Sequence, residues 1–283
     1  MSKIAKVAIG AAVVLVVGLI ISGVAIAALA KRGTNSDANN YVTTEFDVDE
    51  QFSNINIEVI TNDILIKTSS DDKCHVECVD FEEIVHDAYV DGDTLFITSK
   101  DEGTANVGLN FMFNTTSPKI TVYLPENAYE DLYVNATTGD LYIDEAFTFT
   151  NLRLDATTGD ISINSVNCTD ALELNITTGD IDLNDVECGT LVYNGVTGDI
   201  DFINVVVSGD MTVELTTGDV NFDMCDAANI YVDCTTGDID MTLLSDKEFD
   251  VDAQLGDTDY PRSGEGGVCR VSVTTGDVDI EVA

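Results

Sequence analysis

The tetrapeptide Thr-Thr-Gly-Asp recurs through the second half of this 283-residue chain, and this repeat constrains the fold more than any other feature. Six exact copies and one near copy, Val196-Thr197-Gly198-Asp199, follow one another at steps of 19 or 20 residues, apart from one double step of 39 residues before Gly276. The sequence Gln254-Leu255-Gly256-Asp257 divides that double step into 19 and 20, so we expect eight copies. Their glycines are Gly139, Gly159, Gly179, Gly198, Gly218, Gly237, Gly256 and Gly276.

The residues around each glycine alternate between apolar and polar. Around Gly159, for example, Leu152 and Leu154 precede the turn and Ile161 and Ile163 follow it, with polar residues between them. A period of two indicates a strand with one buried face. Glycine supplies the positive φ that a tight turn requires. Each copy therefore predicts a strand, a turn and a second strand.

Coils of about 20 residues cannot bury their own apolar face, but coils stacked ~4.8 Å apart can. We therefore predict an all-β fold, a stacked β-solenoid (β-helix), with eight rungs over residues 131–283. Residues 45–130 are predicted to form an irregular N-terminal β portion that caps the solenoid. Within it, residues 52–68 repeat the same columns with Asn62 in place of glycine, and asparagine tolerates a left-handed backbone well. We interpret this segment as an early rung.

The uncharged residues 7–30 lie between Lys3 and Lys6 on one side and Lys31 and Arg32 on the other. As a helix they would extend ~36 Å, enough to cross a hydrocarbon core of ~30 Å. A secretory signal has an apolar stretch of only ~7–15 residues. We therefore predict a retained transmembrane helix over residues 7–30, a cytoplasmic tail over residues 1–6 and a linker over residues 31–44. Cleavage after the small residues near the end of this segment is the alternative.

The charge is strongly acidic. Twelve Lys and Arg oppose 52 Asp and Glu, which gives a formal net charge of −40 and excludes the binding of a phosphate backbone, so no nucleic acid is expected as a partner. Because 45% of the residues are hydrophobic, the chain is not an acidic disordered tail.

The residue after every repeat glycine is aspartate. These eight are Asp140, Asp160, Asp180, Asp199, Asp219, Asp238, Asp257 and Asp277. A second outward column, two positions further, contains Asp182, Asp201, Asp240, Asp259 and Asp279. Neighbouring carboxylates ~5 Å apart repel by ~1 kcal/mol even at the dielectric constant of water.

Two interpretations account for this aspartate column. In the first, each carboxylate accepts hydrogen bonds from turn amides or threonine hydroxyls of adjacent rungs. Alternatively, the paired columns hold Ca²⁺, which prefers oxygen ligands and binds weakly at extracellular sites of this kind. Calcium is thus the one candidate cofactor, and the eight aspartates are its candidate ligands.

Seven cysteines are present. Cys225, Cys234 and Cys269 fall in apolar columns, which predicts that they are small core residues. Cys168 and Cys188 share one column on adjacent rungs, so a disulfide between them is a second possibility.

We expect no enzyme. The chain has no Gly-x-Ser-x-Gly motif, phosphate-binding loop or zinc motif, and it contains only two histidines. No residue is therefore predicted to be catalytic.

Strings of apolar-x-apolar-x-x-Thr-Thr-Gly-Asp-apolar-x-apolar behind one N-terminal span resemble the bacterial "putative adhesin" family, over about residues 45–283. The resemblance implies a β-solenoid envelope domain of unknown function, without established catalytic residues. It favours a single-pass protein of the cell membrane, with the C-terminal domain outside the cell. The expected function is a non-enzymatic, adhesin-like binding or scaffolding module for an unknown surface or envelope ligand. An accessory component of envelope-stress sensing and a carbohydrate-active enzyme are the alternatives.

The last rung in the sequence predicts an open edge. The chain ends at Ala283, soon after Asp277, Asp279 and Glu281. We expect that this edge is covered by an N-terminal strand or by self-association with a second copy.

Overall fold

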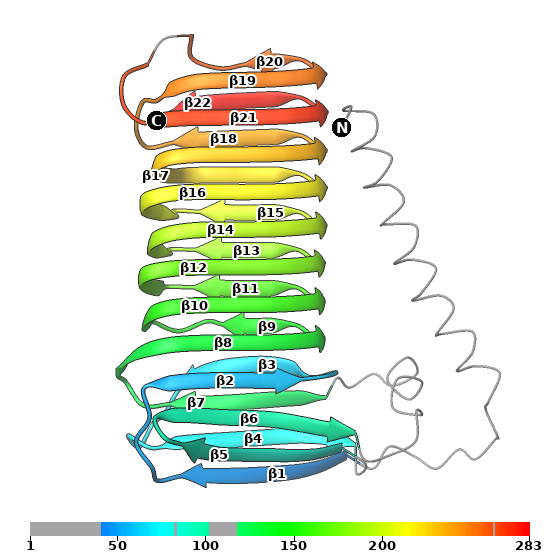
Figure 1. The fold of residues 1–283 in the computed structure, drawn as a ribbon, viewed down its shortest axis with the longest axis vertical. Helices are drawn as coiled ribbons and strands as arrows, with labels where there is room; N and C mark the ends of the chain where they lie inside the picture. The colour runs from blue at the N-terminus through cyan, green and yellow to red at the C-terminus, as the bar shows by residue number, and fades with distance from the viewer. Residues whose placement is uncertain (1–40, 82–83, 102–117, 263) are drawn as a thin grey trace, which may run out of the picture.

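The computed structural model describes residues 41–81, 84–101, 118–262 and 264–283, which form twenty-two strands and no helix. The strands stack into one rod (Figure 1). The predicted all-β stacked solenoid is therefore confirmed for this part of the chain. The predicted tail, the predicted span over residues 7–30 and residues 31–40 of the linker lie outside the described residues. The described residues themselves contain no helix of the length and apolarity that a bilayer crossing needs.

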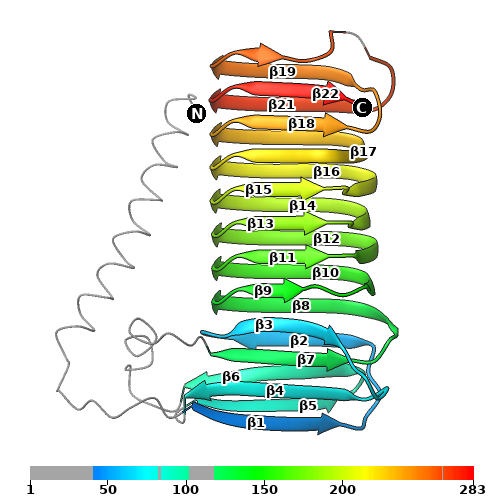
Figure 2. The same cartoon turned by 180° about the vertical axis from the view of Figure 1, so that it is seen from behind.

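Each rung has a longer strand before the Gly-Asp turn and a shorter one after it, on opposite sides of the rod (Figure 2). The longer strands are β8 (Ala128–Thr138), β10 (Phe147–Thr158), β12 (Val166–Thr178), β14 (Glu187–Thr197), β16 (Val206–Thr217), β17 (Val220–Thr236), β19 (Glu248–Leu255) and β21 (Val268–Thr275). The shorter strands are β9 (Leu141–Ile143), β11 (Ile161–Asn164), β13 (Ile181–Asn184), β15 (Ile200–Ile203), β18 (Ile239–Leu243), β20 (Thr258–Asp259) and β22 (Val278–Val282). Strand β17 contains a shorter and a longer segment without a break.

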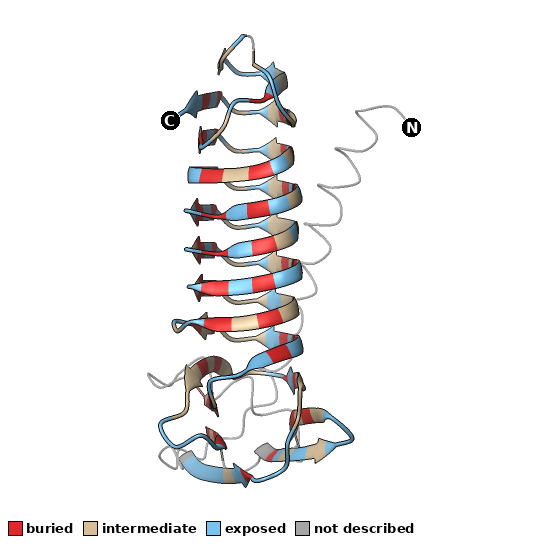
Figure 3. Cartoon of the chain, turned by 90° about the vertical axis from the view of Figure 1, so that its left-hand side faces the viewer, coloured by how far each residue is buried: buried red, intermediate tan, exposed pale blue. Residues whose placement is uncertain are grey.

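The rungs stack in register, and this places like residues above one another. Leu154 of β10 lies opposite Val134 of β8 and Leu174 of β12, and all three are at most 3% exposed. The rings of Phe202 and Phe222 stack with centroids 5.0 Å apart. Figure 3 shows the resulting alternation of buried residues with intermediate or exposed residues along the strands. The predicted period of two thus builds a continuous apolar interior.

The N-terminal end is built differently. Its strands are β1 (Tyr41–Val48), β2 (Asn54–Val59), β3 (Asp63–Thr68), β4 (Cys74–Phe81), β5 (Ile84–Asp91), β6 (Thr94–Asp101) and β7 (Lys119–Leu124). Strands β2 and β3 form a rung that pairs in parallel with β8 and β9, at the place predicted for residues 52–68. Beyond it, antiparallel pairs β5–β6, β4–β7 and β1–β4 replace the regular coils.

The order of the last two rungs differs from the sequence order. Strand β21 pairs with both β17 and β19, and β22 pairs with both β18 and β20. The last rung in the sequence is therefore inserted beneath the rung that precedes it, as Figure 1 shows at the top of the rod. The expectation of an open edge at Asp277, Asp279 and Glu281 is wrong, because β19 and β20 cover that rung.

The chain leaves the regular path at Leu244. The residue seven positions after the glycine is buried in the four rungs from Gly159 to Gly218, as Val205 and Cys225 are, but Leu244 is 40% exposed. Three residues later, Lys247 is buried, and its Nζ lies 2.6 Å from Oδ1 of Asp226. This ion pair holds the segment that connects β18 to β19. That segment passes the rung of β21, which lies between the rungs of β17 and β19.

Candidate functional site

The predicted aspartate column forms one continuous ladder of hydrogen bonds. In every rung, the backbone N–H of the aspartate donates to Oδ1 of the aspartate in the rung beneath. The donor–acceptor pairs are Asp140–Asp63, Asp160–Asp140, Asp180–Asp160, Asp199–Asp180, Asp219–Asp199, Asp238–Asp219, Asp277–Asp238 and Asp257–Asp277, at 2.8–3.0 Å. The ladder therefore begins at Asp63, in the rung beneath the first predicted one, and ends at Asp257.

These bonds explain how a column of like charges is tolerated. A hydrogen bond to a charged group stabilises by about 1.5–3 kcal/mol. The repulsion between neighbouring exposed carboxylates is ~1 kcal/mol before salt screening. The first of the two sequence-based interpretations thus accounts for the column, with backbone amides of the adjacent rung as the donors.

The glycines are required by close approach as well as by backbone conformation. Seven of the eight have φ between 132° and 148°, and Gly256 in the end rung is the exception. A Cβ atom on Gly198 would lie 1.9 Å from the carbonyl oxygen of Gly179 in the rung beneath. No side chain fits at such a distance, so glycine allows the turns to stack.

Asn62 is not a substitute for this glycine. It lies outside the set of residues with positive φ, so the prediction of a left-handed backbone there is wrong. No Gly-Asp turn lies beneath it among the described residues, and the N–H of Asp63 donates instead to the carbonyl of Pro118. Its side chain is buried, and Nδ2 donates to Oδ2 of Asp80 at 2.5 Å. Asn62 thus ties the first turn to β4.

The second acidic column is electrostatically strained. The pKa of Asp182 is raised by partial burial and then by the neighbouring carboxylate of Asp201. Partial burial followed by repulsion from Asp279 likewise raises the pKa of Asp240. Within the described residues, no group of three or more His, Cys, Asp or Glu is placed so that it could hold a metal ion. The calcium ladder stays a prediction.

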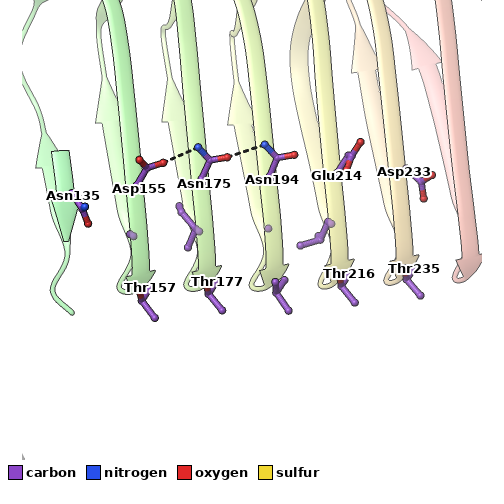
Figure 4. Close-up of a pocket in the computed structure, with 15 residues that line it drawn as sticks. Asn135, Asp155, Thr157, Asn175, Thr177, Asn194, Glu214, Thr216, Asp233 and Thr235 are labelled. Carbon is purple, nitrogen blue, oxygen red and sulfur yellow. Dashed lines mark hydrogen bonds between the residues drawn. The ribbon is translucent and has the colours of Figure 1, made fainter. Parts of the chain in front are cut away.

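A polar groove runs across the longer strands, in the direction of the rod and beside the turns, and has a volume of about 710 Å³. One wall is a row of polar side chains, one from each successive rung, which Figure 4 shows. This wall consists of Asn135, Asp155, Asn175, Asn194, Glu214 and Asp233. The opposite wall consists of Thr157, Thr177, Val196, Thr216 and Thr235.

Hydrogen bonds fix the centre of the first wall. Nδ2 of Asn175 donates to Oδ1 of Asp155, and Nδ2 of Asn194 donates to Oδ1 of Asn175, both at 2.8 Å (Figure 4). Although partial burial alone would raise the pKa of Asp155, hydrogen bonds from Arg153, Asn175 and Tyr133 hold that pKa below its ordinary value. The sequence shows these positions as polar columns, but no signal in it predicts that they line a groove.

Beneath the floor of the groove, a buried tyrosine complements the floor residue Gly195. Tyr193 is completely buried, where the equivalent residues of other rungs are smaller, and its hydroxyl lies where a Cβ of Gly195 would be, 2.0 Å away. The tyrosine ring thus fills the space that a side chain at position 195 would need. Its hydroxyl has no hydrogen-bond partner among the described residues.

All seven cysteines are buried, free thiols. Burial raises the pKa of Cys168 and Cys188 to about 12, so both are protonated at neutral pH. They lie opposite each other in register, as predicted, but the disulfide considered between them is not formed. Parallel side chains on strands ~4.8 Å apart have Cβ atoms farther apart than the ~3.5–4.5 Å of a disulfide.

Comparison with known protein families identifies the family of this solenoid. The model of the family described as Toastrack DUF4097 matches residues 52–282. The chain belongs to the Toastrack DUF4097 family. The match begins just before β2 and ends in β22, so this Toastrack unit comprises the early rung and every later rung. The predicted resemblance to a family of unknown function is confirmed.

A solved structure shows the same fold. The Toastrack chain aligns with a crystal structure called "a putative adhesin" from Bacteroides fragilis NCTC 9343, with a TM-score of 0.54 and 19% identity, over 87% of this chain and 98% of that one. Another "putative adhesin", from Parabacteroides distasonis ATCC 8503, aligns with a TM-score of 0.48 and 14% identity, over 85% of this chain and 97% of that one. Comparison with curated proteins gives no match.

Proposed function

We propose that this Toastrack chain is a non-enzymatic binding module, held at the outer face of the cell membrane by residues 7–30, and that its polar groove binds an extended ligand. The supporting observation is the groove, which continues over successive in-register rungs and offers a repeated set of amide, hydroxyl and carboxylate groups. A rigid row of this kind suits a linear ligand whose own polar groups repeat.

The lining restricts the chemistry of that ligand. The polar groups that line the groove are acids, amides and hydroxyls, its other lining residues are glycine or aliphatic, and no basic or aromatic side chain of the described residues lines it. An anionic polymer would be repelled by Asp155, Glu214 and Asp233, whereas a neutral, hydroxyl-rich chain can exchange hydrogen bonds with all three kinds of group. We therefore propose a neutral linear glycan as the ligand class. The absence of a basic or aromatic lining gives the alternative of a carbohydrate-active enzyme on acidic polysaccharides no support from this groove.

The groove can be tested with the neutral hexasaccharides cellohexaose and hexa-N-acetylchitohexaose, by isothermal titration calorimetry on the full-length protein in detergent micelles. We expect Asn194→Ala to weaken binding about tenfold or more, because it removes one wall amide and frees Asn175. Asn164→Ala is the matched control, since its Nδ2 donates to Asp144 of the adjacent rung at 2.8 Å on the opposite sheet. Equal effects of the two substitutions, or no binding of either sugar, would contradict the proposal.

Anchoring is tested separately. We expect the full-length protein in the membrane fraction of cells, and its solenoid accessible to protease added outside. Protection of the solenoid until the cells are lysed would overturn the proposed orientation. The alternative role in envelope-stress sensing predicts protein partners of residues 1–30, which crosslinking from that segment would capture.

A further inference from the structure

In the part of the chain that the structure describes, the rod ends in a rung that is covered on one side only. We call its outer side the end face; it consists of β19, β20 and the residues between them. Among the described strands, β19 pairs with β21 alone and β20 pairs with β22 alone. An unpaired strand edge presents backbone donors and acceptors to which another strand can bond.

Because no described strand lies above them, the apolar residues of the end face are only partly buried. Phe249, Val251 and Ala253 are partly buried, whereas the residues in the same columns of β21 are at most 1% exposed. Leu255, at the end of β19, is 69% exposed. The difference comes from the missing neighbour, since identical columns become fully buried when a rung lies on both sides.

The charge around these apolar residues is negative. Glu248, Asp252, Asp257 and Asp259 are all exposed, and no basic side chain of the described residues pairs with them. The basic side chains nearby are engaged elsewhere. Arg270 pairs with Asp250 at 3.0 Å, Lys247 pairs with Asp226, and the guanidinium of Arg262 lies 4.2 Å above the ring of Tyr260.

We propose that the end face binds an extended segment of a partner protein in which apolar residues alternate with Lys or Arg, and that this segment adds to β19 as a further strand. Its apolar residues would cover Phe249, Val251 and Ala253, and its basic residues would lie beside Glu248 and Asp252. Main-chain hydrogen bonds supply affinity in strand addition, and alternate side chains supply specificity. A second copy of this chain is a poorer occupant, because two end faces would bring like charges together. This partner site is independent of the groove.

The experiment uses a fluorescent peptide of five Lys-Val repeats and the full-length protein in neutral detergent micelles, with empty micelles as the blank. Binding is followed by fluorescence anisotropy, and protection of β19 by amide hydrogen exchange. The matched peptides are five Glu-Val repeats, and the Lys-Val peptide with alternate amides N-methylated so that it cannot pair with a strand. The matched proteins are the double variants E248Q/D252N and E130Q/E187Q, which lose the same charge at the end face and at exposed sites far from it.

We expect the Lys-Val peptide to bind and to protect amides of residues 248–255. Binding should fall roughly fivefold in E248Q/D252N and remain within about twofold in E130Q/E187Q, in keeping with the modest strength of exposed ion pairs. Equal loss in both variants, or equal binding of the N-methylated peptide, would show attraction to the whole acidic rod and overturn the proposal. A dimer in sedimentation velocity without peptide, lost in E248Q/D252N, would assign the end face to a second copy instead.

Discussion

The backbone N–H of Asp277 donates to the carboxylate of Asp238, which is 39 residues earlier in the chain, at 2.8 Å. The N–H of Asp257, which lies between them in sequence, donates to Asp277 from the other side. The ladder is therefore continuous in space but not in sequence. The rung with the complete Thr-Thr-Gly-Asp turn occupies the inner position, and the rung with Gln-Leu-Gly-Asp occupies the end.

This order can be tested with spin labels on exposed residues of the second acidic column. Asp240 lies opposite Asp279, while Asp259 is one rung farther away. We expect stronger dipolar broadening in the electron paramagnetic resonance spectrum of D240C/D279C than in that of D240C/D259C. Stacking in sequence order predicts the reverse. The native thiols should remain unlabelled because they are buried.

The structural role of the ladder predicts unequal effects of two neighbouring aspartates. Asp180→Ala removes the acceptor of the Asp199 N–H, which should cost about 1–3 kcal/mol and lower Tm by several degrees. Asp182→Ala removes the same charge two residues later, where partial burial and then repulsion from Asp201 raise the pKa, and should leave Tm unchanged or higher. Thermal unfolding followed by circular dichroism at pH 7 decides the matter. A loss of Tm in both variants would mean that the two columns have the same role.

Gly198→Ala should be among the most destabilising single substitutions, by more than about 3 kcal/mol, because the new Cβ meets a backbone oxygen and φ is 142°. Gly92→Ala is the control: it also has positive φ, at 66°, but beyond its two chain neighbours no atom of the described residues lies within 4 Å of the new Cβ. It should cost only about 1–2 kcal/mol. Urea unfolding measures both. If the two costs were equal, backbone conformation alone would explain the repeat glycine.

The raised pKa values of Asp182 and Asp240 give stability a definite dependence on pH. In the folded state both bind protons more readily than in the unfolded chain, so their contribution is most favourable below the ordinary carboxyl pKa of about 3.8 and is lost as pH rises through the raised values. D182N/D240N should therefore be more stable than the parent protein at pH 7, and the difference should shrink as the pH is lowered towards 4. A difference that is constant with pH would exclude this origin.

Calcium binding by the aspartate columns predicts that Ca²⁺ raises Tm more than Mg²⁺ does at equal concentration, and more than Na⁺ at equal ionic strength. Non-specific screening of the acidic surface would give similar shifts for the two divalent ions. D182N/D240N should retain only the screening component if the second column supplies ligands. Differential scanning calorimetry with each salt measures the shifts.

Much of the rod is determined locally. Alternation around Gly159, for example, specifies which side chains enter the core, because successive residues of a strand face opposite sides. The turn glycines and the aspartates beside them were predicted for the same reason, since each needs only its own rung and an identical neighbour. Burial of Cys225, Cys234 and Cys269 follows from their columns and is confirmed.

Only the tertiary structure decided which rung lies beside which. The repeated sequence gives every rung nearly the same strand edges, so the sequence does not distinguish one order of stacking from another. An inner rung is covered on both sides and an end rung on one, so a defective turn costs least at the end. The rung of Gly256 fits that place, and the buried pair of Lys247 and Asp226 holds the connection that leads there. The concave shape between the wall of Asn175 and the wall of Thr177 also arises only when coils stack, since no single rung contains a groove.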